Sequence, residues 1–336
     1  MDKEKRGILR VLNKLVMNNK TFLILLFMVL LLGLTTSTFF TKDNILNVLR
    51  QVSVNVIVSV GFTFVIAMGG IDLSVGSIIG LGGSLMALLM VRGWPLFPVL
   101  IIGVLFGLFC GCLNASIITL LHVPPFIATL ATSSLFRGAC YLLTGMKAVY
   151  GLLDSFIFIG QGYLFGIPFQ IYIMIIVVAI IYIIMNRTSF GRHVIAMGGN
   201  EEATRVCGIN ITKTRYGIFA VVGLCAGIGS VILTARSSSG QISAGQNMEM
   251  DAIASVVIGG TALSGGNANI MGTVAGCFIV GIVSNGLNLL GVDSNWQIIA
   301  KGIMILFAIS VDIMSTRVYQ KTMLNQIIAH NSDDSV

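Results

Sequence analysis

The sequence predicts an all-α polytopic membrane protein of about ten transmembrane helices, with broken or re-entrant segments among them. Of its 336 residues, 56% are hydrophobic and only 10% are charged, whereas a soluble domain carries about 25% charged residues. The apolar residues gather in blocks that approach the roughly 20 residues a membrane span needs. The basic residues lie mainly between these blocks. We therefore expect lipid to be the solvent around most of the chain.

Ten hydrophobic blocks account for the predicted spans. They are residues 21–40, 52–68, 77–91, 95–120, 126–143, 169–185, 216–234, 252–263, 268–291 and 296–314. The eighth block is short for a span, so we expect it to be tilted, broken or re-entrant, and counts of about eight to eleven fit the pattern. The first block shows no small-residue cleavage site, which favours a retained span over a signal peptide.

The placement of lysine and arginine predicts the orientation. Thirteen of the twenty Lys and Arg residues lie in three segments that ten spans would leave on one side, and only five lie on the other. Short cytoplasmic segments carry the excess of Lys and Arg, so we expect the N-terminus to be cytoplasmic in a bacterial inner (plasma) membrane. The predicted organisation is a basic cytoplasmic segment (1–20), a single transmembrane domain (21–315) with a cytoplasmic loop at 186–215, and a cytoplasmic tail (316–336).

Several classes of function are excluded by what the sequence lacks. The net charge of +7 is scattered among apolar blocks, so no basic face for nucleic acid can form. Cys110-Gly-Cys112 has neither the second cysteine pair nor the histidines of a zinc site, and we expect no metal. No G-x-x-x-x-G-K-[ST] loop is present to hold a nucleotide, and no nucleophile–base pair suggests an enzyme. We therefore expect no cofactor in this chain.

The loop between the sixth and seventh predicted spans contains a short helix signal. Asn200 is a good N-cap, Glu201 and Glu202 suit the first turn, and Gly208 suits the stop. The candidate segment consists of Asn200, Glu201, Glu202, Ala203, Thr204, Arg205, Gly208 and Ile209. Such a helix can dock into a groove on a soluble partner, or it can be a connector on the bilayer surface. The two acids favour docking, because they suit anionic lipid poorly.

Two glycine-rich segments resemble one another within the chain. Residues 69–76 and 259–266 match at five of eight positions. Transporters often carry structural repeats with broken helices at matching positions, but short glycine-rich matches also arise by chance. We leave both interpretations open. Asp72 lies in the first segment, where it can cap a helix that starts near Ser74 or take part in gating.

Polar residues inside spans are the candidates for a translocation pathway, because they are costly in lipid and often functional. The candidates are Asp72, Ser74, Asn114, Arg137, Asn285, Asn288 and Gln297, with Asp251 near a span end, together with the backbone at Gly69 and Gly70. Such residues also tie helices together by hydrogen bonds. For each residue taken singly we favour that structural role over contact with a solute.

Several motifs together resemble the ribose-type ABC importer permeases of the branched-chain amino acid/ribose permease superfamily. GRHVIAMGGNEEATRVCGI at 191–209 is similar to that family's ATPase-contacting loop, and GGIDLSVGS at 69–77 to its most recognisable segment. PPFIATLAT at 124–132, DAIASVVIGGTALSGG at 251–266 and NGLNLLGV at 285–292 add to the likeness, which runs from about 45 to 315. Ala203-Thr204 replaces the usual Ala-Ala, and Cys207 stands where serine is common, but neither departure breaks the helix.

The resemblance implies the permease subunit of an ATP-driven importer for a small sugar, with ribose as the first choice. It implies an ABC ATPase subunit that binds ATP and Mg, an extracytoplasmic sugar-binding protein, and a second permease chain, identical or a close paralogue, all within membrane lipid. The alternatives are a self-powered secondary transporter or a channel for a small polar solute. The scarcity of acidic and histidine relays within the spans disfavours the secondary transporter.

Overall fold

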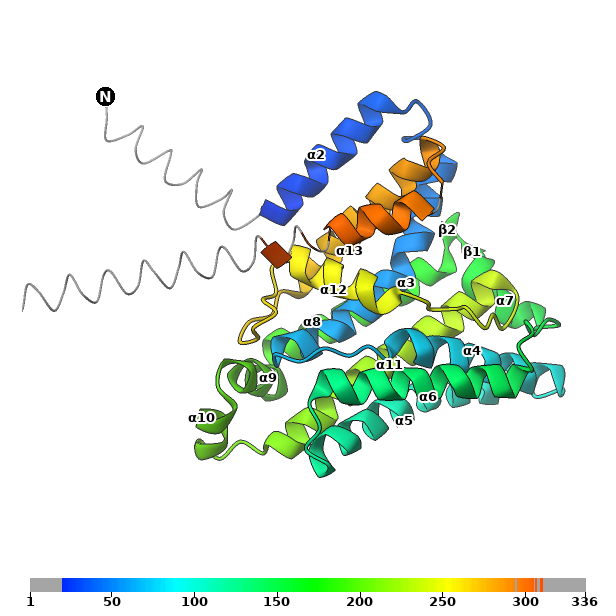
Figure 1. The fold of residues 1–336 in the computed structure, drawn as a ribbon. Helices are drawn as coiled ribbons and strands as arrows, with labels where there is room; N and C mark the ends of the chain where they lie inside the picture. Colours follow the sequence, from blue (N-terminus) through cyan, green and yellow to red (C-terminus); the bar gives the residue numbers. More distant parts are fainter. Residues whose placement is uncertain (1–19, 294, 305, 307–308, 311–336) are drawn as a thin grey trace, which may run out of the picture.

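The computed structural model describes residues 20–293, 295–304, 306 and 309–310. The predicted cytoplasmic segment 1–20, except Lys20, and the predicted tail 316–336 lie outside these residues. The described part is almost entirely helical (Figure 1). Its elements are α2 (Lys20–Thr35), α3 (Lys42–Ala67), α4 (Val75–Val91), α5 (Leu96–Leu120), α6 (Pro125–Thr144), α7 (Asp154–Gln161), β1 (Tyr163–Leu164), β2 (Ile167–Pro168), α8 (Phe169–Arg187), α9 (Ser189–Gly199), α10 (Glu201–Val206), α11 (Ile211–Ser237), α12 (Met248–Ile258) and α13 (Ile270–Leu289). Residues 295–304 form one further helical stretch.

Six of the described helices are long and apolar enough to cross a membrane, namely α3, α5, α6, α8, α11 and α13. Two shorter apolar helices cover Thr21–Thr35 and Val75–Val91. Helix α3 begins at Lys42, ten residues before the hydrophobic block at 52–68, because Thr41 caps it by accepting a hydrogen bond from the Asn44 N–H. Hydropathy alone missed this polar first part of the helix.

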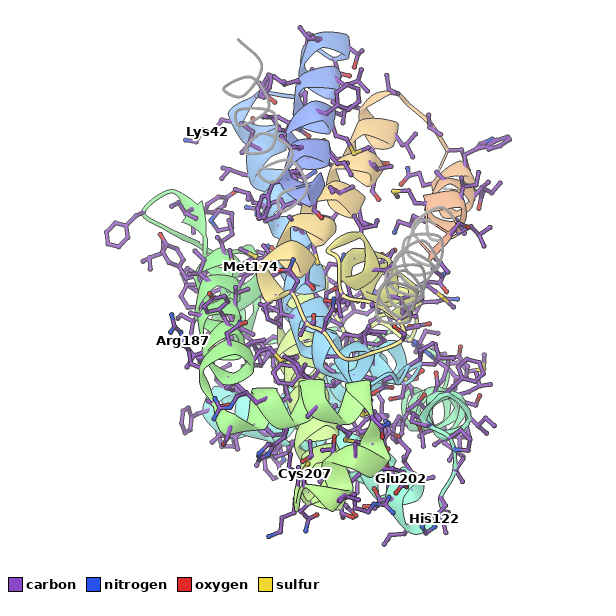
Figure 2. The ribbon with its side chains drawn as sticks, turned by 90° about the vertical axis from the view of Figure 1, so that its left-hand side faces the viewer. Lys42, His122, Met174, Arg187, Glu202 and Cys207 are labelled. Carbon is purple, nitrogen blue, oxygen red and sulfur yellow. The ribbon has the colours of Figure 1, made fainter. Side chains whose placement is uncertain are left out.

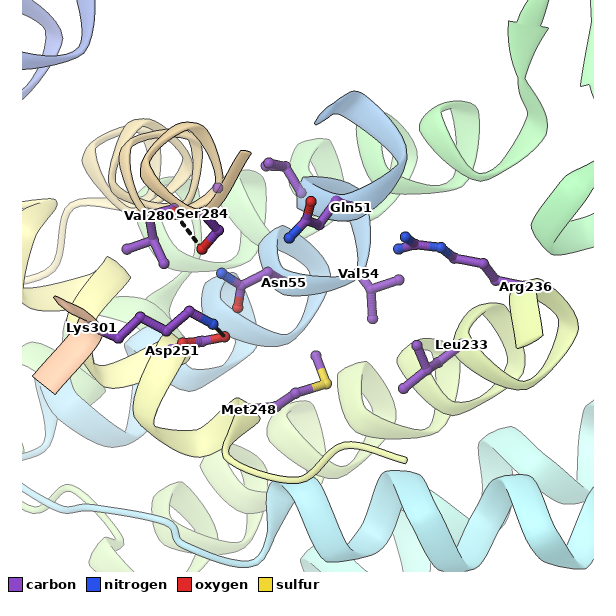
Figure 3. A pocket seen from close by; sticks show the side chains of 12 residues that line it. Gln51, Val54, Asn55, Leu233, Arg236, Met248, Asp251, Val280, Ser284 and Lys301 are labelled. Atoms are coloured by element: carbon purple, nitrogen blue, oxygen red, sulfur yellow. Dashed lines mark hydrogen bonds and ion pairs between the residues drawn. The ribbon is translucent and has the colours of Figure 1, made fainter. Parts of the chain in front are cut away.

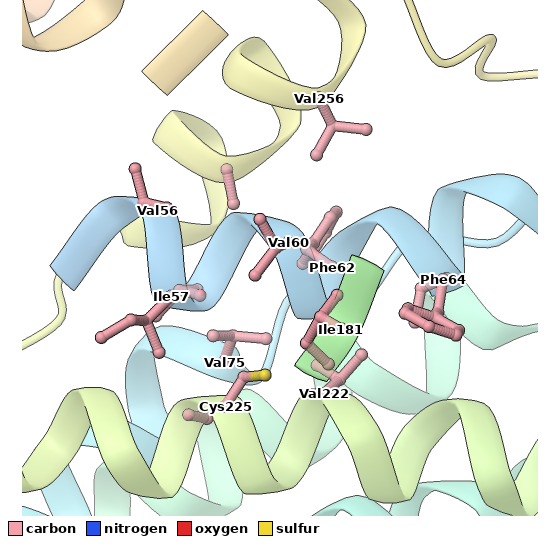
Figure 4. Close-up of a cluster of buried hydrophobic side chains, with 14 of the residues drawn as sticks. Val56, Ile57, Val60, Phe62, Phe64, Val75, Ile181, Val222, Cys225 and Val256 are labelled. Atoms are coloured by element: carbon pink, nitrogen blue, oxygen red, sulfur yellow. The ribbon is translucent and has the colours of Figure 1, made fainter. Parts of the chain in front are cut away.

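Helix α3 forms the centre of the molecule, and its side chains are buried on all sides along its second half. Figure 4 shows Val60 and Phe62 of α3 among side chains of the surrounding helices, which include Val222 of α11 and Val256 of α12. A helix that is apolar all round is expected inside a membrane protein rather than at its edge. The apolar core therefore fixes α3 and α11 as the frame on which the other helices pack.

Helices α5 and α11 approach closely through glycine. Gly103, Gly107 and Gly111 recur every four residues of α5 and so share one face. A Cβ atom at Gly223 of α11 would lie 3.0 Å from the Gly107 carbonyl carbon and 3.1 Å from the Gly111 Cα. Small residues let helices approach in this way in membranes, where van der Waals packing drives association. The glycines explain how α11 reaches the centre of the bundle.

The two glycine-rich segments that resemble one another are both helix breaks. Helix α3 ends with hydrogen bonds from Gly69 N to Ile66 O and from Gly70 N to Val65 O. Helix α12 ends with the equivalent bonds, from Gly260 N to Val257 O and from Thr261 N to Val256 O. Both are Schellman ends with a left-handed glycine, Gly69 (φ 79°) and Gly260 (φ 90°). The structural register therefore pairs Gly69 with Gly260, not with Gly259 as the sequence match suggested.

The short eighth block is the 11-residue helix α12, which is preceded by irregular backbone from 238 to 247. This agrees with the expectation of a broken segment. Three elements were not predicted: helix α7, the hairpin of β1 and β2, and helix α9. Helix α9 occupies the first part of the 186–215 loop and starts at the N-cap Thr188, whose hydroxyl accepts from the Gly191 N–H. These elements are short, and their apolar residues blend into the neighbouring blocks.

Candidate functional site

The predicted short helix is present as α10, and its ends are those that the sequence indicated. The Asn200 Oδ1 accepts a hydrogen bond from the Ala203 N–H at 2.9 Å. At the other end Gly208 adopts a left-handed conformation (φ 83°), and the Ile209 N–H bonds to the Thr204 carbonyl at 3.3 Å. Thr204 is the buried residue of α10. The helix is confirmed, and its docking role stays a prediction.

Helix α10 projects from one end of the molecule (Figure 2). Glu202 and Cys207 lie at this end together with His122, while Lys42 at the start of α3 lies at the opposite end. Val206 is 86% exposed, although its side chain is apolar. Cys207 is also exposed. The free face of α10 therefore presents an apolar and a thiol side chain to solvent.

The two acids of α10 have different environments. Glu201 is held by Arg215 of α11, whose Nη2 donates to both carboxylate oxygens at 3.0 and 2.9 Å. The Arg215 side chain is only 16% exposed, so this pair is partly shielded from water. Glu202 is 77% exposed and lies 3.6 Å from Arg205. Glu201 therefore fixes α10 to α11, whereas Glu202 is available to a partner.

A groove lies between α10 and the turn that joins α5 to α6. It has a volume of about 550 Å³ and is lined by His122 and Pro124 on one side and by Glu201, Arg205 and Arg215 on the other. Its lining combines apolar residues such as Ile118 and Ile211 with the charged Glu201, Arg205 and Arg215. It brings the α5–α6 turn into the same surface as the predicted coupling segment.

Glycines of three segments meet near the C-terminal end of α9, namely Gly198, Gly69 and the pair Gly265–Gly266. The Gly266 N–H donates to the Ala67 carbonyl at the end of α3 at 2.9 Å. A Cβ atom at Gly198 would collide with that carbonyl and would lie 2.6 Å from the Gly266 nitrogen. A Cβ at Gly265 would lie 2.8 Å from the Gly69 nitrogen and 3.0 Å from the Gly198 oxygen. We call this contact the glycine junction. It joins the α9–α10 loop directly to both helix breaks.

Asp72 lies in the break between α3 and α4 and has a capping role. Its Oδ1 accepts hydrogen bonds from the Ser74 N–H at 2.8 Å and from the Ser74 hydroxyl at 2.6 Å, just before α4 begins. The Asn114 amide donates to the Ser74 hydroxyl at 2.7 Å. The Thr129 hydroxyl accepts from the Leu73 N–H at 3.1 Å, and its single hydrogen lies within reach of the Pro125 carbonyl at 2.8 Å and the Ile71 carbonyl at 3.2 Å. A gating role for Asp72 stays untested.

The remaining predicted pathway residues tie elements together. Arg137 of α6 donates to the carbonyls of Ile242 and Ala244 at 2.7 and 3.2 Å. Those carbonyls belong to irregular backbone, which must find partners within the protein when water is excluded. These two carbonyls therefore take the place of an acidic partner for Arg137.

Two amide pairs complete this set. Asn285 and Asn44 exchange hydrogen bonds at 2.8 and 3.2 Å, which links α13 to α3. The Gln297 amide donates to Asn288 at 2.7 Å. Interhelical amide bonds of this kind hold membrane helices together. These contacts agree with the structural interpretation favoured for each residue singly.

A polar cleft of about 150 Å³ lies elsewhere, among α3, α11, α12 and α13 (Figure 3). Its polar lining consists of Gln51, Asn55, Arg236, Asp251, Ser284 and Lys301. The Lys301 Nζ and the Asp251 Oδ2 form an ion pair at 2.9 Å across it. Of the polar candidates named from the sequence, Asp251 lines this cleft and the others do not.

Comparison with known proteins shows the family of this chain. The family model described as branched-chain amino acid transport system / permease component matches residues 44–309. The chain belongs to this family.

The ribose import permease RbsC of Haemophilus influenzae is 42% identical to this permease over 305 residues, which cover 90% of this chain and 94% of that relative. RbsC of Bacillus subtilis is 42% identical over 293 residues, with coverage of 87% and 91%. The D-allose transport system permease protein AlsC of Escherichia coli is 36% identical over 294 residues, with coverage of 87% and 90%. No solved structure matches the chain.

The polar cleft of the permease was missed at the sequence level, but a signal for it exists. Gln51, Asn55, Ser59 and Thr63 recur every four residues within α3, and residues at this spacing share one face of a helix. This polar stripe on an otherwise apolar central helix could have marked the cleft wall. The pairing of Asp251 with Lys301 could not have been found, because 50 residues separate them.

Proposed function

We propose that this permease is the membrane-spanning subunit of an ATP-driven ABC importer for ribose or a related monosaccharide. The ribose import permeases are 39–42% identical over most of the chain, and permeases for D-allose and xylose are also similar. Sugars of this kind are small, neutral and rich in hydroxyl groups. An apolar helical bundle with a few polar linings suits the passage of such a solute.

The observation that carries the coupling part of the proposal is the capped, exposed helix α10. ATP and Mg would be bound by a partner ABC ATPase, and α10 with the adjoining groove would seat in that partner. Glu202 and the exposed Val206 form the contact surface, while Glu201 holds α10 against α11 through Arg215. Movement of the ATPase then moves α10, and the glycine junction passes that movement to both helix breaks.

We further propose ten spans in the bacterial inner membrane, with the N-terminus and α10 on the cytoplasmic side. An extracytoplasmic sugar-binding protein delivers the solute to the opposite end. Two permease chains, identical or closely paralogous, assemble with the ATPase pair within membrane lipid. The excess of Lys and Arg in the N-terminal segment and in the 186–215 loop supports this orientation.

Reconstitution tests the proposed function. Proteoliposomes with the permease, its ATPase and its binding protein are expected to accumulate labelled ribose only when ATP is supplied. Liposomes with the permease alone serve as the control. Uptake by the permease alone under an ion gradient would instead establish a secondary transporter, and flux without either energy source would establish a channel. A binding protein that takes leucine and no sugar would overturn the substrate class.

The native thiol of Cys207 tests the orientation. Cys207 is exposed beside α10, whereas Cys110, Cys140, Cys225 and Cys277 are buried. A membrane-impermeant maleimide is expected to label Cys207 in inverted vesicles and to leave it unlabelled in intact cells. A Cys207→Ser variant identifies the labelled site. Labelling of Cys207 from outside intact cells would reverse the proposed orientation.

A further inference from the structure

The polar cleft among α3, α11, α12 and α13 lies deep within the helical bundle. Asn55 is the fourteenth residue of the 26-residue helix α3, so it lies about 20 Å from the start of a helix about 39 Å long. Asp251 is in the first turn of α12, and Figure 3 shows its carboxylate facing Lys301 across the cleft. The Asp251 and Lys301 side chains are 22% and 31% exposed, so a solute in the cleft can reach both.

The cleft contains hydrogen-bonding groups that the protein does not satisfy well. Within the described residues, the Gln51 side chain makes no hydrogen bond to another protein group. The Asn55 amide meets Ser255 and Ser59 only at 3.4 Å, and the Arg236 Nη1 meets the Arg50 carbonyl at 3.5 Å. Gln51, Asn55 and Arg236 are only partly buried, so their hydrogen-bonding capacity is open to a molecule that enters the cleft.

The chemistry of the lining identifies the class of that partner. Side-chain amides offer donors and acceptors together, and they match hydroxyl groups, which also donate and accept. Asp251 and Lys301 neutralise one another at 2.9 Å, and Arg236 adds one positive charge to the lining. Hydroxyl groups of a neutral solute can accept hydrogen bonds from Arg236 and Lys301 and donate to Asp251.

We propose that this cleft is a binding site of the translocation pathway for a neutral polyhydroxylated solute. The solute's hydroxyl groups bond to Gln51 and Asn55 on α3 and to the Asp251–Lys301 pair opposite. The proposal rests on the proposed function, because it names the place where the transported sugar contacts this chain. Asp251 was a sequence-based candidate, whereas Arg137, Asn285 and Gln297 make contacts between elements instead.

The test measures the amount of sugar moved per ATP hydrolysed in proteoliposomes that hold the complete importer and its loaded binding protein. Gln51→Met keeps the size of the side chain and removes its amide, and Asn55→Leu does the same at the second position. We expect the double variant to move about tenfold less ribose per ATP, because each lost hydrogen bond contributes about 0.5–1.5 kcal/mol and about 1.4 kcal/mol is tenfold. ATP hydrolysis stimulated by the binding protein should persist, since α10 is untouched.

Ser53→Ala is the matched control. Ser53 lies on α3 between the two cleft residues, is buried, and bonds the Arg50 carbonyl of its own helix at 2.9 Å, so it should transport normally. The single variant Gln51→Met tests the site with little risk of misfolding, because the Gln51 amide makes no hydrogen bond to another protein group among the described residues. Wild-type sugar per ATP in the double variant overturns the cleft site. If the wild type takes up ribose phosphate and not ribose, the cleft is an anion site instead. If the wild type shows no ATP-driven uptake, the proposed function itself is overturned.

Discussion

Replacing Gly198 by alanine tests whether the glycine junction transmits movement from α10 to the membrane helices. The added methyl group would collide with the Ala67 carbonyl and would lie 2.6 Å from the Gly266 nitrogen. These two groups are themselves joined by a hydrogen bond of 2.9 Å. Both neighbours are backbone, so neither can rotate away, and the α9–α10 loop must shift instead.

The magnitude follows from these contacts. Overpacking of a tight site costs about 1–3 kcal/mol, and loss of the Gly266–Ala67 hydrogen bond adds about 0.5–1.5 kcal/mol. Alanine recovers up to about 1 kcal/mol of helix propensity. The net penalty of roughly 1–3 kcal/mol disfavours the native seating of the loop by about tenfold or more. We expect Gly198→Ala to lose most of its substrate-stimulated ATP hydrolysis while the permease remains folded in the membrane.

Gly199→Ala is the matched control, because a Cβ atom at Gly199 meets nothing within 4 Å. The two variants add the same methyl group at neighbouring positions of α9. The assay is ATPase stimulation in proteoliposomes, with the amount and melting temperature of the purified complex measured in parallel. Equal stimulation in both variants would refute the argument that the junction is a rigid contact.

Further variants separate the seating of α10 from its contact surface. Asn200→Ala should weaken α10 by about 1 kcal/mol and lower ATPase stimulation in part, whereas Ala203→Pro should abolish stimulation, because it removes the N–H that Asn200 caps and unwinds the first turn. Glu202→Arg should prevent ATPase binding without unfolding the permease, since this side chain is 77% exposed, and co-purification measures it. Bound ATPase should protect Cys207 from maleimide labelling, and unchanged labelling would place the docking surface elsewhere. Asn285→Leu leaves Asn44 without its reciprocal partner and should lower the melting temperature without changing the number of sugars moved per ATP.

Local signals were sufficient for the parts of the molecule that depend on neighbours in sequence. Asn200 and Gly208 lie at the two ends of α10, and both act within four residues of themselves. Asp72 caps at Ser74 for the same reason. The apolar blocks also predicted a membrane protein, because the length of an apolar run decides whether it can span lipid. The expectations that failed, such as the late start of α3, arose where polar residues lie inside a helix.

The sequence by itself thus determined the helical membrane class and the capped helix α10, whereas it left open whether the similar segments at 69–76 and 259–266 are helix breaks. Only the tertiary structure decided which polar groups meet. It paired Asp251 with Lys301, placed Arg137 on the carbonyls of Ile242 and Ala244, and brought Gly198 against Ala67. Each of these contacts joins segments far apart in the chain. Their partners depend on how the helices pack around α3, and no local pattern of residues records that packing.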